Sequence, residues 1–309
     1  MNRMGYACIN MHLSNQKPKI YTGRSMIKRT FKSKGITYAS ELGLQNCKDL
    51  FEIIKWNHEN GFNFFRITSN LFPWCSEYKL SDMPDYEEIC DVLSKAGSYA
   101  TTNDIRITSH PGPFNVLTSP HEHVVENCIK DLSTHGEVFD LMNLSRTPYN
   151  KINIHIGGAY GDKVSSMERF CTNFHRLPNS VKSRLTVEND DKASMYSVVD
   201  LYEGVYKVIG IPIVFDYHHH RFCTGGLTEE DALEVAISTW VDIVPVVHYS
   251  ESRNIEQEDD KIRPQAHSDY VYDYIDTYGN RVDIMVEAKA KELAVLKYKE
   301  IHNDIRTNS

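Results

Sequence analysis

Histidine and acidic residues recur along the chain at one kind of place, directly after short apolar runs. Six successive runs end in this way, at His110, His155, Glu188, Asp216, His248 and Glu287. Because Asp and Glu are almost never fully buried unless they are paired, carboxylates that end apolar runs and converge on a packed interior need cations. The spacing therefore predicts a metal site.

The mixture of ligand types narrows the choice of metal. Imidazole and carboxylate together suit Mn²⁺ or Zn²⁺, whereas Mg²⁺ and Ca²⁺ prefer shells made only of oxygen. His219 and His267 extend the set to eight ligands, more than one ion takes, so we expect two or three divalent ions, Mn²⁺ and/or Zn²⁺. Two ions about 4 Å apart stabilise both the attacking and the leaving oxygen in phosphodiester displacement. Sugar isomerases also use two ions, so both chemistries stay open here.

Single members of the set also have ordinary structural interpretations. His155 alone is typical of a core histidine, and Glu188 alone could serve the turn at Asn189–Asp191 as a helix-capping partner. The run His218–His220 could be an exposed loop, and on an extended chain at most one or two of its rings face a common centre. We expect the remaining helical histidines to face solvent, namely His123, His135, His175 and His302.

The apolar runs alternate with longer amphipathic stretches from one end of the chain to the other. Such alternation is typical of parallel strands that are each followed by a helix, and parallel strands buried on both faces read as near-continuous apolar runs. Eight units of this kind predict an α/β fold, a (β/α)₈ TIM barrel, formed by residues 1–309 as one domain. The expected strands are residues 5–10, 62–68, 104–109, 151–156, 184–189, 211–217, 242–249 and 281–287.

The barrel would bring the chemical residues together. In this fold, side chains at the carboxyl ends of the strands and the loops after them build the active site. Two long polar insertions, residues 13–40 and 251–266, follow the first and seventh expected strands and would lie at the same end. Helical spacing of Val124, Val125, Cys128, Ile129 and Leu132, a capping box at residues 228–231 before a helix 232–240, and an Ala/Lys/Glu/Leu-rich stretch 288–305 predict three of the helices.

Composition sets outer limits on the function. The formal charge of −8 argues at first against a nucleic-acid partner, but residues 11–40 hold seven Lys and Arg and no Asp or Glu. This basic segment is either a solvated loop or an arm that attracts phosphates. The seven cysteines are scattered without a Cys-x-x-Cys pair, which favours a reducing compartment. No secretory or membrane-spanning segment is recognisable, so we expect a monomer inside the cell, cytoplasmic or nuclear, with no membrane partner.

Spaced motifs over nearly the whole chain resemble the UV-damage endonucleases, metal-dependent repair enzymes on a TIM barrel related to endonuclease IV. The motifs that carry the resemblance are residues 4–6 with Asn10, and residues 65–73, 109–112, 153–158, 187–191, 215–220, 248–250, 267–270 and 285–289.

The resemblance implies a substrate and a set of roles. It implies nicking of double-stranded DNA immediately 5′ of cyclobutane pyrimidine dimers and 6-4 photoproducts, which leaves a 3′-hydroxyl and a 5′-phosphate. Glu188 and Glu287 would bind or bridge metal, and Asp216 and the five histidines would complete the shells. Glu188, Asp216 and Glu287 are then the expected catalytic residues. The residues expected to contact DNA or the lesion are Tyr6, Asn10, Phe114, Lys28 and Arg29.

Three positions depart from the family pattern. The family typically follows His-Pro-Gly with Gln and an aromatic residue, and this chain has Pro113 and Phe114. The modified Lys that members often carry two residues before the strand-seven His is Val246 here. A His expected after the strand-two motif is missing, and Glu77 is the nearest residue of a ligand type.

The leading hypothesis is therefore a metal-dependent DNA-repair endonuclease, in which bridged ions activate water for in-line attack beside a photoproduct. The nearest alternatives on the same barrel are an abasic-site endonuclease of the endonuclease IV type and a sugar isomerase of the xylose-isomerase type. An alternative of another class is a catalytically weakened damage-binding protein, because the Gln and the Lys are absent. The intact Glu188, Asp216 and Glu287 argue against that alternative.

Overall fold

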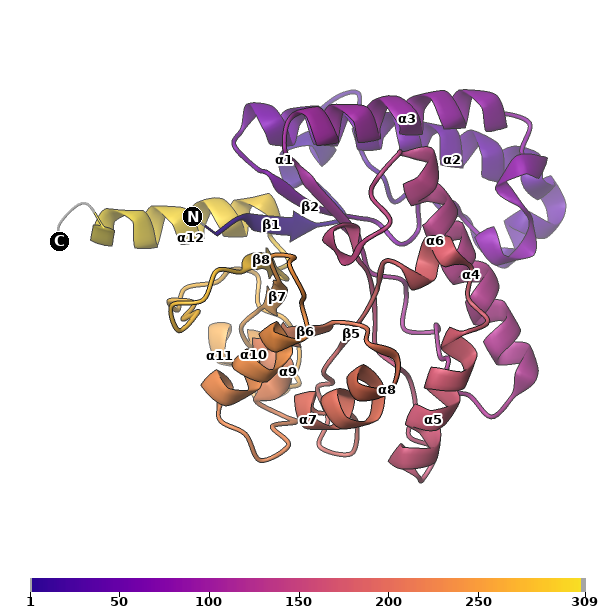
Figure 1. Ribbon diagram of the computed structural model, residues 1–309. Helices are drawn as coiled ribbons and strands as arrows, with labels where there is room; N and C mark the ends of the chain where they lie inside the picture. Colours follow the sequence, from indigo (N-terminus) through magenta and orange to yellow (C-terminus); the bar gives the residue numbers. More distant parts are fainter. Residues whose placement is uncertain (1, 307–309) are drawn as a thin grey trace.

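Eight short parallel strands close into a barrel in the order of the chain, β1 through β8 and back to β1 (Figure 1). This computed structural model describes residues 2–306. The predicted (β/α)₈ barrel is confirmed. The strands are β1 (Met4–Ala7), β2 (Phe64–Ile67), β3 (Arg106–Ser109), β4 (Ile152–Ile154), β5 (Leu185–Glu188), β6 (Ile213–Asp216), β7 (Val246–Tyr249) and β8 (Asp283–Val286).

The helices surround the barrel as an outer layer (Figure 1). The longer ones are α2 (Lys28–Glu59), α3 (Tyr86–Thr102), α4 (Glu122–Leu141), α5 (Lys163–Phe174), α10 (Glu229–Ser238) and α12 (Glu292–Arg306). Shorter turns are α1 (Met11–Ser14), η1 (Cys75–Glu77), η2 (Leu80–Asp82), η3 (Pro148–Asn150), α6 (Asn179–Lys182), α7 (Val198–Leu201), η4 (Tyr202–Tyr206), α8 (Lys207–Ile209), α9 (Tyr217–His220) and α11 (Arg253–Glu256). Within residues 2–306, no helix combines the length and the apolar character that crossing a membrane requires.

Each expected strand overlaps the observed one, but the observed strands are shorter. β3 ends at Ser109 and β4 at Ile154, so His110 and His155 lie one residue beyond the ladder. The backbone leaves the barrel at these points because the next residues turn into loops. The amphipathic spacing over residues 124–132 is confirmed by α4, and Thr228 caps α10 by accepting a hydrogen bond from the backbone amide of Asp231.

The expected polar insertion at residues 13–40 is only partly a loop. Helix α2 already begins at Lys28, and its helical geometry breaks at Gly35, which has φ 64° and ψ −159°. A left-handed φ of this kind favours glycine, which explains why a helix can bend at this residue. The basic residues from Lys28 onward therefore lie on the first turns of a helix, and only the earlier ones lie in a loop.

The barrel interior is filled in layers. Ala7, Phe64, Val214, Val246 and Met285 form a small apolar cluster with Trp240, separate from the larger core between strands and helices. Gly5 lets β1 approach β2, because a side chain at this position would collide with the carbonyl oxygen and ring of Phe64. Polar side chains lie above and below this layer.

The floor of the barrel is a buried ion pair. Arg106 is fully buried, and its Nη1 lies 2.8 Å from Asp283 Oδ2 and 2.8 Å from the carbonyl oxygen of Val244. Its Nε donates to the carbonyl oxygen of Tyr149 at 2.7 Å. A buried guanidinium is tolerated only when it is paired in this way, so Asp283 closes the amino-terminal end of the barrel.

We predict that Asp283→Ala destabilises the fold strongly, because it leaves the Arg106 guanidinium buried without its counter-ion. The expected loss is about 3–5 kcal/mol of the free energy of unfolding. Urea titration followed by circular dichroism measures it. Glu203→Ala is the matched control, since it removes an exposed, solvent-screened ion pair with Lys207 and should have a much smaller effect. Equal losses in the two variants would contradict the assignment.

Candidate metal centre

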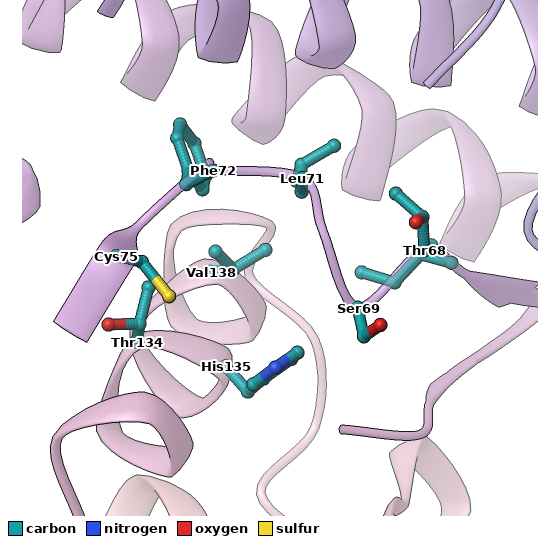
Figure 2. A pocket seen from close by; sticks show the side chains of 9 residues that line it. Thr68, Ser69, Leu71, Phe72, Cys75, Thr134, His135 and Val138 are labelled. Carbon is teal, nitrogen blue, oxygen red and sulfur yellow. The ribbon is translucent and has the colours of Figure 1, made fainter. Parts of the chain in front are cut away.

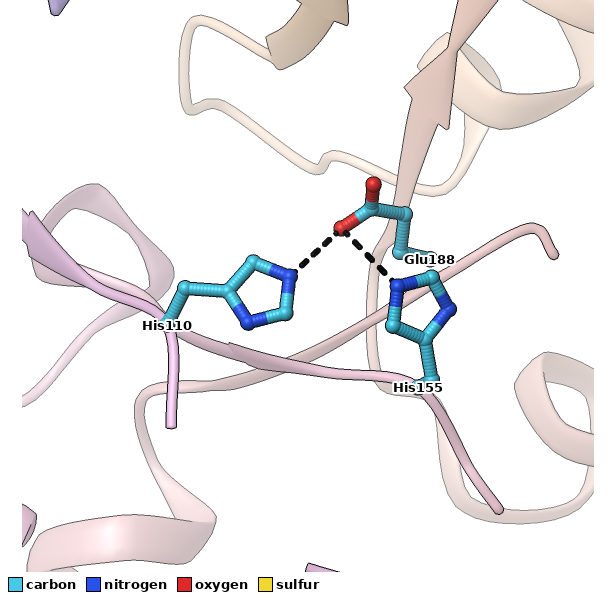
Figure 3. Close-up of side chains that lie close together, drawn as sticks. All are labelled: His110, His155 and Glu188. Atoms are coloured by element: carbon cyan, nitrogen blue, oxygen red, sulfur yellow. Dashed lines mark hydrogen bonds and ion pairs between the residues drawn. The ribbon is translucent and has the colours of Figure 1, made fainter. Parts of the chain in front are cut away.

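The carboxylate of Glu188 lies at the centre of the barrel mouth. It ends β5, is 1% exposed, and receives contacts from strands on several sides. His110 Nε2 lies 3.0 Å from Oε2, and His155 Nε2 lies 4.0 Å from the same oxygen (Figure 3). His248 Nδ1 lies 3.1 Å from Oε1, and His219 Nδ1 lies 3.5 Å from it. The two oxygens of Glu188 therefore face two different pairs of imidazoles.

Asp216 and Glu287 add two more carboxylates to this cluster. His248 Nδ1 lies 3.1 Å from Glu287 Oε1, and His219 Nδ1 lies 3.9 Å from Asp216 Oδ2. His267 Nδ1 lies 3.7 Å from Glu287 Oε2. The structure thus brings together all eight residues that the sequence predicted as ligands. The tightest groups are His110 with His155 and Glu188, and Glu188 with Asp216 and His248.

The donor set fits divalent cations. Asp216 is fully buried, and its Oδ2 has no hydrogen-bond partner among the described residues. A buried carboxylate oxygen without a partner is costly, and a cation beside it removes the cost. Mixed nitrogen and oxygen ligands are those of Zn²⁺ and Mn²⁺ sites. The cluster is therefore a candidate metal centre.

The protein itself keeps two carboxylates ionised. Burial alone would raise the pKa of Glu188, but His248 and His155 hold it well below its usual value. Burial likewise opposes ionisation of Glu287, but Arg66 and His248 outweigh burial. The pKa of Glu287 is therefore also well below its usual value. Asp216 behaves differently, because burial together with Glu188 and Glu287 raises its pKa to about 6. Crowded negative charge at one mouth explains the difference.

The imidazoles differ in their charge. Burial would lower the pKa of His155, but Glu188 and Asp190 outweigh burial and raise it to about 10. His155 Nδ1 lies 2.9 Å from Asp190 Oδ1. Burial dominates at His248 and lowers its pKa to about 4, with Lys151 acting in the same direction. Without a metal, His155 is therefore the positive partner of Glu188.

Sequence reasoning missed four residues in and around the cluster. Asn153 donates from Nδ2 to Glu188, and Thr186 fixes that amide by donating to Asn153 Oδ1 at 2.7 Å. Arg66 on β2 pairs with Glu287. Lys151 is fully buried, and its Nζ lies 3.1 Å from His248 Nε2. The signal was present, because Lys151 and Asn153 precede His155 at intervals of two, and side chains at such intervals share one face of a strand.

Two residues predicted to contact DNA are placed elsewhere, and that prediction is corrected. Tyr6 is fully buried among the rings of Phe62 and Phe65, on the side of β1 that faces the helices. Its hydroxyl donates to Asn57 Oδ1 at 2.5 Å and accepts from Asn10 Nδ2 at 2.8 Å. Asn10 is also fully buried and caps α1 through the backbone amide of Leu13. Both side chains hold the first loop in place and are covered by protein.

Phe114, Lys28 and Arg29 lie at the surface. Phe114 follows β3 and His110 and is 64% exposed. Lys28 and Arg29 are exposed on the first turn of α2. Their loop is docked on the next one, because Trp74 donates from Nε1 to the carbonyl oxygen of Met26 at 2.9 Å. These three side chains are accessible to a ligand at the mouth of the barrel.

The helical histidines do not all face solvent. His123 and His175 are exposed, as expected, but His135 on α4 is 7% exposed, so that expectation is wrong for this residue. It reaches under the segment after β2, where it lines a narrow pocket with Ser69 and Cys75 (Figure 2). His302 is half-buried, with its ring centroid 4.4 Å from that of Tyr298. The amphipathic period of α4 could not show that the segment after β2 covers the side of the helix that carries His135.

Asp131 on α4, which contacts Cys75 and His135 of that pocket, ties two mouth loops to the helix. Asp131 Oδ2 accepts a hydrogen bond from Asn115 Nδ2 at 2.8 Å, and its Oδ1 accepts from Cys75 Sγ at 3.3 Å. His135 Nε2 lies 3.7 Å from Asp131 Oδ2. Asn115 is the neighbour of Phe114, so this buried carboxylate fixes the base of the loop that exposes Phe114.

Comparison with known proteins decides the family. The sequence model of the family described as UV-endonuclease UvdE matches residues 2–307. The chain belongs to the UV-endonuclease UvdE family. A solved structure, the crystal structure of SacUVDE, superposes with a TM-score of 0.83 at 30% identity and covers 99% of both chains.

Two curated relatives of the UvdE family support the same placement. The UV-damage endonuclease of Schizosaccharomyces pombe is 35% identical over 96% of this chain, and the match covers 50% of that relative. This chain therefore spans about half the length of the fission-yeast protein. The UV DNA damage endonuclease of Bacillus mycoides is 33% identical over 82% of this chain and 80% of its own length.

The departures from the UvdE pattern can now be placed. Glu77 is exposed on η1 and lies outside the metal-type groups found among the described residues. Val246 is fully buried in the apolar layer beneath His248. The amine that touches His248 comes instead from Lys151, across the barrel interior. The pKa of Lys151 is lowered to about 7, chiefly by burial.

We predict that metal affinity rises with pH between pH 6 and 8. The raised pKa of His155, about 10, means that the metal-free imidazole is protonated throughout this range, and a cation must displace the proton. One displaced proton corresponds to about a tenfold gain in apparent affinity per pH unit. Competition of Zn²⁺ between the protein and a chromophoric chelator measures the slope.

His155→Asn is the control for this slope, because it removes the titrating ring and keeps a polar side chain. Its affinity should be lower at pH 8 and vary much less with pH. A slope that is identical in the variant and in the unchanged protein would show that His155 is not a metal ligand.

Proposed function

We propose that this protein is a metal-dependent endonuclease that nicks double-stranded DNA immediately 5′ of UV photoproducts, cyclobutane pyrimidine dimers and 6-4 photoproducts. The products would be a 3′-hydroxyl and a 5′-phosphate. Membership of the UvdE family supports the substrate class. The observation that carries the chemistry is Glu188, whose two carboxylate oxygens face imidazoles from opposite sides of the barrel mouth.

The residues that would hold the ions are those of the metal centre. Glu188 would hold ions through its two carboxylate oxygens, together with His110 and His155 near Oε2, and His248 and His219 near Oε1. Asp216, Glu287 and His267 would complete the shells, and the number of carboxylates and imidazoles suits two or three ions of Mn²⁺, Zn²⁺ or both. Divalent cations here would supply positive charge to the scissile phosphate and lower the pKa of an attacking water.

The chain's own residues keep these ligands ready. Asn153 holds the Glu188 carboxylate in place, so its oxygens need not reorient when a substrate arrives. Arg66 keeps Glu287 ionised and orients it. His219 donates from its backbone amide to Asp216 Oδ1 at 2.8 Å, which leaves Oδ2 free for a cation. Preorganised charge of this kind is usually the largest contribution to catalysis.

Lesion recognition would depend on the loop after β3. Phe114 is an exposed apolar ring beside the metal centre and suits a wedge between bases or a stacking surface for a displaced base. Pro113 replaces the amide that family members typically place before the aromatic residue, so it offers no side-chain hydrogen bond. We therefore expect this protein to recognise lesions by shape and stacking, and to discriminate less between bases than family members that carry the amide.

The test is cleavage of end-labelled duplexes that carry one thymine dimer, one 6-4 photoproduct, one abasic site or no lesion, in the presence of Mn²⁺. We expect a nick directly 5′ of the photoproducts. Replacing a residue that only hydrogen-bonds to a metal ligand typically lowers metal affinity or activity by about 10–100-fold. Glu188→Gln changes an expected ligand itself, so it should lower the cleavage rate by more than about 100-fold. Glu77→Gln removes an exposed carboxylate and should leave cleavage unchanged.

Other outcomes would reassign the protein. Cleavage only at the abasic site would indicate an endonuclease of the endonuclease IV type. Binding of photoproducts without any cleavage would indicate a damage-binding protein. Neither binding nor cleavage, together with turnover of an aldose, would indicate a sugar isomerase.

We further propose that Lys28 and Arg29 attract the DNA backbone. Each phosphate contact contributes about −0.9 to the slope of log affinity against log salt concentration. The double charge reversal Lys28→Glu with Arg29→Glu should therefore flatten that slope by up to about two. Fluorescence anisotropy with a labelled lesion duplex at several salt concentrations measures it.

The matched control reverses two exposed lysines on outer helices, Lys95→Glu on α3 and Lys130→Glu on α4. Both double variants change the net charge equally. If they flatten the slope by the same amount, only the overall charge matters, and the contact assigned to Lys28 and Arg29 is wrong.

A further inference from the structure

Two neighbouring mouth loops are built in the same way. Each follows a strand and the metal-type histidine one residue beyond its end, and each contains a glycine, one further residue and then an exposed aromatic ring. After His110 the sequence is Gly112-Pro113-Phe114, and after His155 it is Gly158-Ala159-Tyr160. Phe114 is 64% exposed and Tyr160 is 50% exposed. The function proposed above uses only the first of these two rings.

In both loops the ring lies back over its glycine. A side chain added at Gly112 would collide with the Phe114 ring. One added at Gly158 would lie 3.1 Å from Cε2 of Tyr160, tighter than most real contacts. The glycine in each loop therefore leaves the space that the ring occupies, and a larger residue there would displace the ring.

The backbone at Tyr160 is held in an unfavourable conformation. Its φ is +47°, and the nearby glycines Gly157 and Gly161 have φ +111° and +81°. A left-handed conformation is unfavourable for a non-glycine residue and persists where the surrounding structure enforces it, often at functional sites. Here the surrounding bonds are the Tyr196 hydroxyl to the carbonyl oxygen of Gly158 at 3.3 Å, and the Asp162 amide to that of Ala159 at 2.9 Å.

The two loops also lock onto each other. Gly157 packs so closely against Val116 and Thr118 of the first loop that a side chain there would overlap both. Arg169 bridges them, because its Nε donates to the carbonyl oxygen of Thr118 at 2.8 Å and its Cζ lies 5.8 Å from the centroid of the Tyr160 ring. The loops that carry Phe114 and Tyr160 are therefore packed and hydrogen-bonded together beside the candidate metal centre.

The charged groups around Tyr160 are already engaged within the protein. Asp162 is exposed two residues later and caps α5 by accepting from the backbone amide of Ser165 at 3.2 Å. Arg169, whose Cζ lies 5.8 Å from the ring centroid, donates from Nε to the carbonyl oxygen of Thr118 and from Nη2 to Ser166 Oγ, so neither charge is left as a dedicated phosphate site. The uncharged face of a nucleobase suits an aromatic ring in this setting, since base stacking needs only a π face.

We propose that Tyr160 is a second base-stacking residue, which acts with Phe114 to hold bases displaced from the duplex around the lesion. This inference rests on the proposed function, because it takes damaged DNA as the ligand. It assigns Tyr160 to substrate positioning, with no part in the chemistry at the metal centre.

The experiment combines affinity with a contact-specific readout. Tyr160→Ala should weaken binding of a thymine-dimer duplex by about tenfold, the order expected for loss of one base–aromatic stack, and should raise KM more than it lowers kcat. Tyr160→Phe should keep the affinity. Tyr274→Ala is the matched control, because Tyr274 is 60% exposed but lies against His302 of α12.

The contact itself is tested by photocrosslinking. Duplexes with 5-iododeoxyuridine at single positions around the dimer are irradiated with the protein, and the crosslinked peptide is identified by mass spectrometry. We expect at least one position to crosslink at Tyr160 and none at Tyr274. Gly158→Ala should displace the ring and weaken the same crosslink without removing the aromatic side chain.

The outcomes separate this inference from the proposed function. If the unchanged protein neither binds nor cleaves the photoproduct duplex, the proposed function has failed. If it cleaves normally, while Tyr160→Ala has the same KM and no position crosslinks at Tyr160, only the role of Tyr160 is overturned. A Tyr160→Phe variant as weak as Tyr160→Ala would likewise exclude stacking as the cause.

Discussion

The burial of one carboxylate organises the mouth of this barrel. Glu188 is 1% exposed and stays ionised, so its negative charge must be compensated from every direction. His110, His155 and His248 come from three other strands to do so, and Asn153 adds a neutral donor. Any strand that slipped by one residue would turn its ligand out of the barrel and leave this charge unpaired. The same constraint makes the centre suitable for cations.

The sequence was sufficient to predict the barrel, and the residues that meet at its mouth, for a specific reason. In parallel strands that are followed by helices, the carboxyl ends all meet at one mouth, so a residue's position at the end of an apolar run also locates it in space. His110, Glu188 and Glu287 follow this rule, and the prediction needed no knowledge of side-chain packing. His267 was included in the ligand set although it lies in a loop after β7 and does not end a run, so this rule does not account for it.

The failures have an equally specific cause. A run shows where a strand lies but not which of two neighbouring residues faces inward. Tyr6 alternates with Gly5 and Ala7, and it is Ala7 that belongs to the interior layer, so the tyrosine packs under the helices. The same alternation places Lys151 and Asn153 below His155 in the barrel interior. The prediction did not include them because they lie within an apolar run and not at its end. His135 was missed because its burial depends on a loop about sixty residues earlier in the chain.

The closed floor of the barrel also determines the order of events at its open end. Arg106 and Asp283 close the amino-terminal end, and the apolar layer around Phe64 and Val246 lies between that floor and the metal centre. If the proposed function holds, ions would enter and leave through the mouth, the same opening that a DNA duplex would cover. Metal loading would then precede DNA binding, and exchange of the ions would wait until the nicked product departs.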